Sequence, residues 1–466
     1  MSLCSRSWKK LSSPGFPPTS AFQPTSAFQR SPALKRSPIL KPSPTWKPLD
    51  FSRKGIAIVS ADEKIEEENL PDYATSRYYP VTIGEIFRAR YQVVGKLGFG
   101  TTSTVWLARD LTAGQHVAIK LYVESDFSDS SLDNELKAYE RIHNTSNMHP
   151  GRYAVRTLLD SFNIDGPNGR HQCLVHPPLW DDVYGLRHRN PARRFPEPVM
   201  AFVLERLFQA LDLLQALDLL HQECHIAHTD IQEGNLLFNA EKSVFSDFEQ
   251  EELDNPSPRK ELDGKIVYQS RELGQAYKVS RLVLSDFGSS MRVDDGIEHL
   301  EDIQPDVYRA PEVILQIPWT SSVDIWNAGC LIWDCFQGGH LFTGREPEFE
   351  TYRSRAHLAE IIALLGPPPP SLLARANLRS KFFSDTGKSC TALDSFALSN
   401  TGLTGNFRAG ISLPEPRTLE QREKFLKGED KECFLRLMRK MLQWEPEKRS
   451  SAKELLKDEW ILKHLE

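Results

Sequence analysis

The hydrophobic and polar residues of the chain divide it into a strand-rich front part and a helix-rich back part. In the front part, short apolar runs alternate with polar positions and are bounded by turn residues, which predicts β-strands. From Val199 onward the apolar spacing is helical, and residues 202–222 are apolar enough for a long buried helix. This change indicates an α+β fold with two lobes of different character and a cleft between them. The front elements predicted are strands at 91–99, 103–110, 116–123, 152–165 and 171–178, and one charged helix at 131–142.

The residues before the first strand have another composition. Residues 18–47 form a degenerate six-residue repeat (PTSAFQ, PTSAFQ, RSPALK, RSPILK, PSPTWK), in which proline recurs too often for a helix. We therefore expect residues 1–65 to be a mostly disordered tail and residues 66–90 to be an extension that packs on the strand-rich lobe. The tail is either a plain solvated segment or a regulatory one, because four of its serines precede proline and can accept phosphate. These serines are Ser13, Ser31, Ser37 and Ser43.

Charge and cysteine content limit the partners and the compartment. Residues 1–49 hold eight Lys or Arg and no acid, so the remainder has 57 − 8 = 49 basic against 63 acidic residues, a net charge of −14. An acidic body disfavours direct nucleic-acid binding and favours basic protein partners. No apolar run predicts a membrane span or a secretion signal, and the seven cysteines form no CxxC pair. Cytoplasmic and nuclear localisation is therefore expected, with a mitochondrial transit peptide as the alternative that the basic, acid-free N-terminus leaves open.

The first chemical motif is LGFGTTSTV, residues 97–105. Gly98 and Gly100 stand between two predicted strands, where glycine lets backbone N–H groups approach phosphate oxygens closely. A dinucleotide-binding fingerprint would need a helix after the glycines, and none is predicted here. Ser103 occupies the position at which a third glycine would complete G-x-G-x-x-G.

The next strand carries VAIK, which ends at Lys120. A single lysine on a strand is usually solvated, but one that follows a glycine turn and points into a cleft can bind phosphate. Such a lysine needs an anion to hold it, and Glu135 on the predicted helix is the best candidate.

The motif HTDIQEGN, residues 228–235, places a proton acceptor and a metal ligand close together. Asp230 can accept a proton from a hydroxyl nucleophile, and Asn235 can bind Mg²⁺. LSDFGSS supplies Asp286 as a second oxygen ligand. The similar FSDFEQ contains Asp247 but lacks the glycine, and LVLSDFG is an apolar strand that runs into a flexible turn, so Asp286 is preferred.

Three more motifs follow in order: YRAPE (308–312), SSVDIWNAGC (321–330) and WEPEKRSSAKELLKDEW (444–460), whose Arg449 can pair with Glu312. In this order, the motifs resemble a eukaryotic protein kinase across residues 91–463. The sequences HTDI, LGFGTTSTVWLA, YYPVTIGEIF and EDIQPDVYRAPEVIL are similar to the SR protein kinases (serine/arginine-rich splicing-factor kinases), and closest to their filamentous-fungal branch.

The resemblance implies a bilobal kinase domain, with a β-rich lobe at about 91–180, a helical lobe at about 181–463, and an inserted loop at about 240–280. It implies a serine/threonine protein kinase that transfers the γ-phosphate of Mg-ATP to protein hydroxyls. Its substrates would be Arg/Ser-rich proteins, its process the regulation of mRNA splicing, and its state a monomer. Neither a nucleic acid nor a membrane is an expected partner.

The resemblance also implies roles for single residues. Lys120, paired with Glu135, would hold the α- and β-phosphates, Asp230 would be the catalytic base, and Asn235 and Asp286 would hold magnesium. His176 would stand at the gatekeeper position, and residues 177–179 would form the hinge to the adenine. The remaining nucleotide contacts would be Leu97, Gly98, Gly100, Ser103, Val105, Ala118, Leu179 and Leu237.

Four departures from the usual kinase pattern bear on activity. Thr229 replaces the arginine that clamps an activation-loop phosphate, so we expect no dependence on such a phosphate. Gln232 replaces the lysine that contacts the transferring phosphate, which removes a positive charge worth a few kcal/mol of transition-state stabilisation or roughly 10²-fold in rate. Pro305 and Asp306 replace the family's Thr and Arg.

The insert between Asn235 and Asp286 is acidic, and is either a solvated charge run or a substrate or regulatory loop. The alternative to an active enzyme is a pseudokinase that serves as a binding scaffold, and Gln232 is the residue that favours it.

Overall fold

A computed structural model of the chain describes residues 45–51, 55–71, 73–124, 130–144, 150–189, 226–262, 265–276, 279–293, 296–384, 407–455 and 457–463. The predicted helix at 202–222 and all but the end of the repeat tail lie outside these residues. In the part of the chain that is described, no helix combines the length and apolar character needed to cross a membrane.

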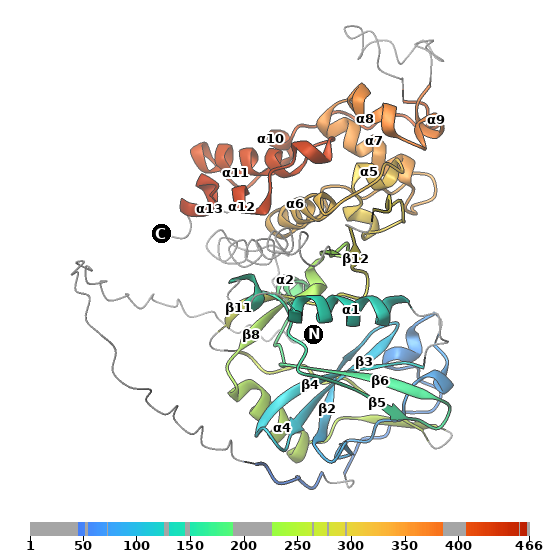
Figure 1. Cartoon of the computed structure of the whole chain (residues 1–466), viewed down its shortest axis with the longest axis vertical. Coiled ribbons are helices and arrows are strands. Elements are labelled where there is room, and N and C mark those ends of the chain that lie inside the picture. Colours follow the sequence, from blue (N-terminus) through green and yellow to red (C-terminus); the bar gives the residue numbers. More distant parts are fainter. Residues whose placement is uncertain are drawn as a thin grey trace, which may run out of the picture. The chain divides into compact units, whose positions relative to one another are not determined.

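The front part folds into one antiparallel sheet with the strand order β1-β2-β3-β4-β6-β5 (Figure 1). Its strands are β1 (Ile86–Phe87), β2 (Tyr91–Phe99), β3 (Ser103–Asp110), β4 (Gln115–Tyr122), β5 (Asp160–Asp165) and β6 (Arg170–His176). Helix α1 (Ser130–Asn144) lies over this sheet. Four of the five predicted strands and the predicted helix are thus confirmed within a few residues.

The predicted strand at 152–165 is wrong in its first half. Residues Pro150–Tyr153 form a 3₁₀ turn, and only Asp160–Asp165 join the sheet. The backbone between them pairs elsewhere: Val155 forms a parallel bridge with Leu284, and Arg156 N–H donates to the Leu284 carbonyl at 2.9 Å. An apolar run in this segment therefore joins the sheet to the back part of the domain.

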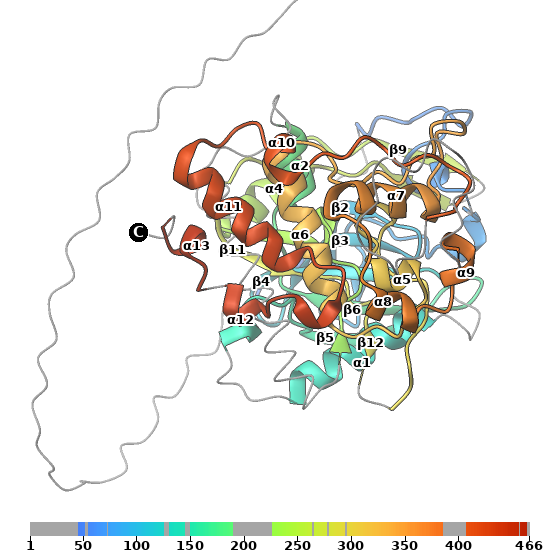
Figure 2. The same cartoon turned by 90° about the horizontal axis from the view of Figure 1, so that it is seen from above.

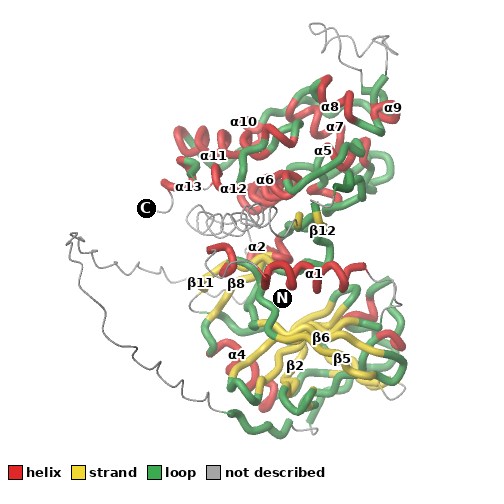
Figure 3. Tube along the Cα trace, viewed as in Figure 1, coloured by secondary structure: helices red, strands yellow, loops and turns green. Residues whose placement is uncertain are grey.

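The back part is helical, as predicted (Figure 3). Its central helix is α6 (Ser322–Gln337), in which fourteen of sixteen residues are buried and which ends at Gly338, where a φ of +77° suits glycine. Helix α11 (Gly428–Met441) packs on it, and shorter helices surround it (Figure 2). These are α2 (Val183–Arg189), α5 (Pro311–Ile314), α7 (Ser354–Leu365), α8 (Pro370–Arg375), α9 (Arg379–Phe382), α10 (Leu419–Arg422), α12 (Ala452–Leu455) and α13 (Glu459–Lys463).

Two short antiparallel pairs carry the motif residues. Strand β8 (Leu236–Ala240) pairs with β11 (Val279–Leu284), and β7 (Ile226–Ala227) pairs with β12 (Met291–Arg292). In the first pair Leu236 lies opposite Leu284. Asn235 precedes one strand and Asp286 follows the other, so the register brings the two predicted metal ligands to the same end of the pair.

The insert predicted as a loop at about 240–280 is a folded layer. It consists of helix α4 (Ser243–Asp254) and the hairpin β9 (Arg259–Leu262) and β10 (Lys265–Tyr268). Phe245 and Phe248 on α4 are buried against Val94 and Leu107 of the sheet. The acidic composition of this insert does not indicate that it packs on the domain. Its phenylalanines nevertheless share one helical face, which packs on the sheet, while most of its carboxylates face outward.

The chain begins its contacts with the domain well before residue 65, so the predicted boundary of the disordered tail lies too far along the chain. Trp46 packs edge-on against His116 with ring centroids 5.0 Å apart, and the Arg109 guanidinium lies 4.7 Å from its ring. Further on, Glu67 and Glu68 are buried beside Lys96 and Lys260 respectively. Aromatic and ionic partners far along the chain thus order a segment whose own composition is not that of a core.

Candidate active site

Lys120 is the centre of an ion cluster between the two lobes, in which Lys120 and Glu135 are buried and Asp286 is half-exposed. Its ammonium lies 2.8 Å from Oε2 of Glu135 on α1 and 3.1 Å from Oδ1 of Asp286. Burial alone would lower the pKa of Lys120, but the two carboxylates outweigh it and raise that pKa. Burial would likewise raise the pKa of Asp286, yet Lys120 holds it below its ordinary value. The predicted pair of Lys120 and Glu135 therefore forms, and Asp286, predicted as a metal ligand, joins it. Lys120 and Asp286 stay charged at neutral pH.

An aromatic column links α1 to the loop that carries Asp230. The Tyr139 ring packs edge-on against Phe287 with centroids 5.4 Å apart, and Phe287 packs against His228 at 5.3 Å. The Asp324 carboxylate accepts the backbone N–H groups of His228 at 3.0 Å and Thr229 at 2.9 Å. The sequence motif that contains Asp324 does not indicate this role, because nothing local shows what a buried helix carboxylate accepts.

Thr229 has a structural role at the position where many kinases have arginine. Its hydroxyl donates to the Ser289 carbonyl at 2.7 Å, which ties the loop of Asp230 to the segment after Asp286. Thr229 and Asp286 both have positive φ, +66° and +64°, a conformation that costs non-glycine residues about 1–3 kcal/mol each. The neutral hydroxyl of Thr229 thus joins two strained loops.

The Asp230 carboxylate is held by two side-chain amides. Gln232 donates to its Oδ1 and Asn235 to its Oδ2, both at 2.8 Å. Burial raises the pKa of Asp230, although these amides and nearby His228 act in the opposite direction. A carboxylate with a raised pKa is a stronger proton acceptor, which suits a general base. The three residues predicted on this loop are thus brought together around the base.

The predicted nucleotide residues lie on the sheet and on the strand pair below it. Val105 is directly opposite Lys120 in the β3–β4 register, and Ala118 is two residues away on the same face. The turn of the glycine motif is closed by a bond from Gly100 N–H to the Ser103 carbonyl at 2.8 Å. A Cβ added at Gly98 or Gly100 would meet nothing within 4 Å, so the space beside this backbone is open for phosphate oxygens. The other predicted contacts are Leu97 at the end of β2, Leu179 after β6, and Leu237 on β8.

The donor set fits magnesium that arrives with a nucleotide. Among the described residues, no group of three or more His, Cys, Asp or Glu side chains could hold a metal by itself. Asn235 and Asp286 offer one amide and one carboxylate, and Ser285 N–H donates to the Asn235 carbonyl at 2.9 Å, which fixes their spacing. Mg²⁺ in phosphotransferases takes one or two protein oxygens together with substrate phosphates and water.

Two buried ion pairs lie in the helical lobe. Arg449 makes two bonds with Glu312, at 2.6 and 2.7 Å, and both side chains are fully buried, so this predicted contact forms. Arg187 on α2 lies 2.8 Å from Glu233, inside the HTDIQEGN motif. The second pair was not predicted, because nothing local in the sequence shows which basic residue Glu233 meets.

This arrangement defines a phosphoryl-transferring enzyme on the two-lobed protein kinase fold. The glycine turn lies above the cluster of Lys120 and its carboxylates, and Asp230 and the two oxygen ligands lie below it. The family model described as a protein kinase domain matches residues 91–461, and the chain therefore belongs to the protein kinase family.

Similar proteins with known names narrow the class of protein kinase. The chain is 39% identical over 409 residues to a serine/threonine protein kinase of Aspergillus fumigatus, a match that covers 87% of this chain and 93% of that protein. It is 28% identical over 415 residues to the serine/threonine-protein kinase SRPK of Physarum polycephalum (85% and 91% covered). It is 27% identical over 415 residues to protein kinase dsk1 of Schizosaccharomyces pombe (70% and 75% covered). The predicted serine/threonine protein kinase, similar to SR protein kinases, is confirmed, and the pseudokinase alternative finds no support.

Proposed function

We propose that this kinase uses Mg-ATP to phosphorylate serines within arginine-rich segments of proteins. The observation that supports this class of substrate is an acidic segment that is hydrogen-bonded, through side-chain amides, to the loop of Asp230. Glu298, Glu301, Asp302 and Asp306 are exposed within residues 296–306. Arg309 pairs with the last two of these carboxylates, both at 3.0 Å, so the segment and this arginine together keep a net negative charge.

Side-chain amides connect this acidic segment to the loop of the base. Gln304 bonds to Asn327 on α6, and Asn327 Nδ2 donates to the Ile231 carbonyl, next to Asp230, at 3.1 Å. A peptide whose serine reaches Asp230 therefore passes close to several carboxylates. Arginine is the natural partner of such a surface, because its planar guanidinium can bind carboxylates through two hydrogen bonds.

The geometry of the site residues supports the roles that we propose for them. Lys120 binds the non-transferred phosphates, and Asp230, oriented by Gln232 and Asn235, accepts the proton of the substrate hydroxyl. When bound, Mg²⁺ on Asn235 and Asp286 supplies positive charge to the phosphates. We further propose a monomer that acts in the cytoplasm and nucleus, in pathways such as mRNA splicing, without direct contact with nucleic acid or membrane.

Peptides of matched length test the substrate class. We expect an Arg-Ser repeat peptide to be phosphorylated with a kcat/KM about tenfold or more above that of a Lys-Ser repeat, and a Glu-Ser repeat to be a very poor substrate, because a bidentate arginine contact adds about 1.4 kcal/mol or more. The double variant Glu298→Gln/Glu301→Gln should raise the KM for the Arg-Ser peptide and leave the KM for ATP unchanged. Equal rates for the arginine and lysine peptides would refute the proposal.

Gln232 predicts a kinase that runs below the rate its site could reach. A lysine at this position would place a positive charge beside the transferring phosphate, a gain of a few kcal/mol of transition-state stabilisation, so we expect Gln232→Lys to raise kcat by roughly 10²-fold. The measurement is steady-state phosphate transfer from labelled ATP.

The matched control is Gln232→Met, which keeps the length of the side chain but removes the amide. Its kcat should fall, because Asp230 loses the 2.8 Å bond that orients it. Unchanged rates in both variants would mean that residue 232 does not contribute to phosphoryl transfer.

A further inference from the structure

Glu233 is a buried carboxylate in the loop of the proposed base. It stands between Gln232 and Asn235, whose side-chain amides hold the Asp230 carboxylate. Its side chain is only 4% exposed, and its two oxygens lie 2.8 and 3.0 Å from Nε of Arg187 on α2. The proposed base, the metal ligands and the phosphate contacts do not include this acid, so its burial requires another explanation.

Stability does not explain the buried pair. Burial raises the pKa of Glu233 although Arg187 acts in the opposite direction, so the folded protein holds this charge at a cost. An apolar pair of the same volume is often as stable as a buried ion pair, or more stable. An ion pair differs in that its hydrogen bonds have a fixed direction and length. The adjacent Gly234 has no side chain and is exposed, so Glu233 is the residue that anchors the backbone between the two amides.

Helix α2 is itself fixed to the strand that follows the loop. Just before α2 begins, Trp180 N–H donates to the Phe238 carbonyl and Phe238 N–H donates to the Asp181 carbonyl, both at 2.8 Å. Strand β8 carries Phe238 and starts directly after Asn235. The buried ion pair therefore closes a ring that runs from the loop along β8, across to α2, and back to the loop. Within such a ring, the position of α2 determines the position of the loop.

We propose that Arg187 is a positioning residue for phosphoryl transfer. Through Glu233, it holds the backbone of the loop where the amides of Gln232 and Asn235 both reach the Asp230 carboxylate. A displacement of a catalytic group by about 1 Å can cost roughly 10²-fold in rate, so an anchor next to the base matters even without contact with the reacting atoms. This inference rests on the proposed role of Asp230 as the base, which the variant Asp230→Asn tests by itself.

Single-turnover transfer of labelled phosphate from ATP to an Arg-Ser repeat peptide tests the proposal, because product release does not limit the rate in that assay. We expect Arg187→Met to lower the transfer rate by about tenfold or more, since the base loses its alignment. The KM values for ATP and for the peptide should stay within about twofold of the wild type, because Lys120 and the acidic segment 296–306 are unchanged. Arg187→Lys keeps the charge but binds as a point charge, so its rate should lie between those of the wild type and Arg187→Met.

A double variant separates positioning from stability. Arg187→Met leaves the Glu233 carboxylate buried without its partner and should make the protein easier to unfold in urea, whereas Arg187→Met/Glu233→Gln removes that charge and should recover the lost stability. The double variant still lacks the ion pair, so its transfer rate should stay about tenfold or more below that of the wild type.

Lys440→Met is the matched control for destabilisation. It leaves the Asp458 carboxylate, which is 1% exposed, without its 2.7 Å ion pair among the C-terminal helices. This variant should lose stability and still transfer phosphate at the wild-type rate per folded molecule. A rate that recovers together with stability in the double variant, or a wild-type rate in Arg187→Met, would overturn the proposal. If instead Asp230→Asn kept the wild-type rate, the base itself would be wrongly assigned, and the positioning role would fall with it.

Discussion

Replacing Asp230 with asparagine should lower kcat by about 10³-fold or more, since a positioned general base contributes about 10²–10⁴-fold and the variant also loses the negative charge that Gln232 and Asn235 orient. The substitution keeps the size of the side chain. It removes a carboxylate whose pKa burial has raised, which means that the folded protein holds this charge at a cost. The variant should therefore be at least as stable to heat as the wild type and still bind ATP. Loss of activity with retained stability separates a catalytic role from a structural one.

The chain offers a matched control for this experiment. Asp247 stands in the similar sequence FSDFEQ but lies exposed on α4, so Asp247→Asn should transfer phosphate at the wild-type rate. The assay is transfer from labelled ATP to an Arg-Ser repeat peptide, with thermal unfolding and nucleotide binding followed in parallel. A wild-type rate for Asp230→Asn would show that the hydroxyl proton leaves by another route.

The active site could be predicted from the sequence because its parts are local. Most motifs place their functional residue in a turn or near the end of a strand, and short connections account for the neighbouring pairs β1–β2, β2–β3 and β3–β4. Because side chains alternate between the two faces of a strand, the sequence alone is sufficient to place Lys120 on the same face as Ala118. The family resemblance implied the pair of Lys120 and Glu135, whereas the contact between Lys120 and Asp286 emerged only from the fold.

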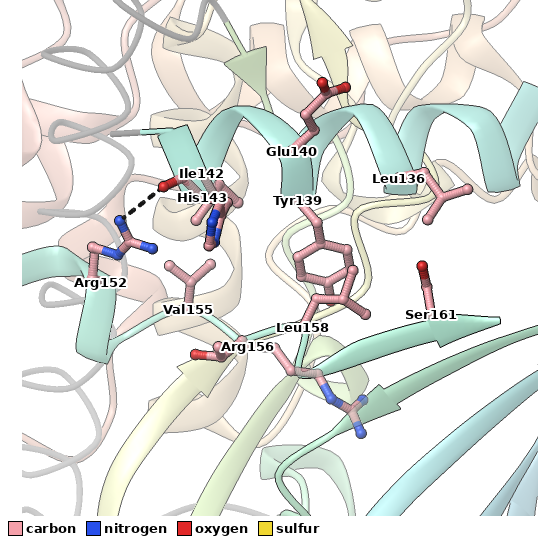
Figure 4. A pocket seen from close by; sticks show the side chains of 11 residues that line it. Leu136, Tyr139, Glu140, Ile142, His143, Arg152, Val155, Arg156, Leu158 and Ser161 are labelled. Atoms are coloured by element: carbon pink, nitrogen blue, oxygen red, sulfur yellow. Dashed lines mark hydrogen bonds between the residues drawn. The ribbon is translucent and has the colours of Figure 1, made fainter. Parts of the chain in front are cut away.

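The layer that covers the sheet could not be predicted, because its contacts join residues far apart in sequence. Lys260 in the insert is 192 positions from Glu68, and its ammonium lies 3.0 Å from that carboxylate. Each residue alone looks like an ordinary solvated charge. The pairing of Val155 with Leu284 is equally non-local, and it turned a predicted strand into the wall of a cavity of about 360 Å³ behind α1 (Figure 4).

Breaking the buried pair of Arg449 and Glu312 should have the largest effect on stability. We expect Arg449→Met to lower the free energy of unfolding by about 3–5 kcal/mol, because it leaves the Glu312 carboxylate buried and uncompensated. The same change removes the donors to the Ser322 carbonyl at 3.0 Å and the Gln443 carbonyl at 3.1 Å, and the packing of the guanidinium over Trp326 at 5.2 Å. These contacts join YRAPE, α6 and the C-terminal helices, so the loss should affect the whole helical lobe. Urea denaturation followed by tryptophan fluorescence measures it.

Two further variants identify the source of the loss. The double variant Glu312→Gln/Arg449→Met removes the uncompensated charge along with its partner, and it should recover part of the stability, although the two carbonyls remain without their donor. Arg375 and Glu447 form a comparable pair at 3.1 Å, but the two side chains are 44% and 56% exposed, so Arg375→Met should cost no more than about 1 kcal/mol. If Arg449→Met and Arg375→Met destabilised the protein equally, burial would not be the cause, and the Arg449–Glu312 pair would be no more important than a surface contact.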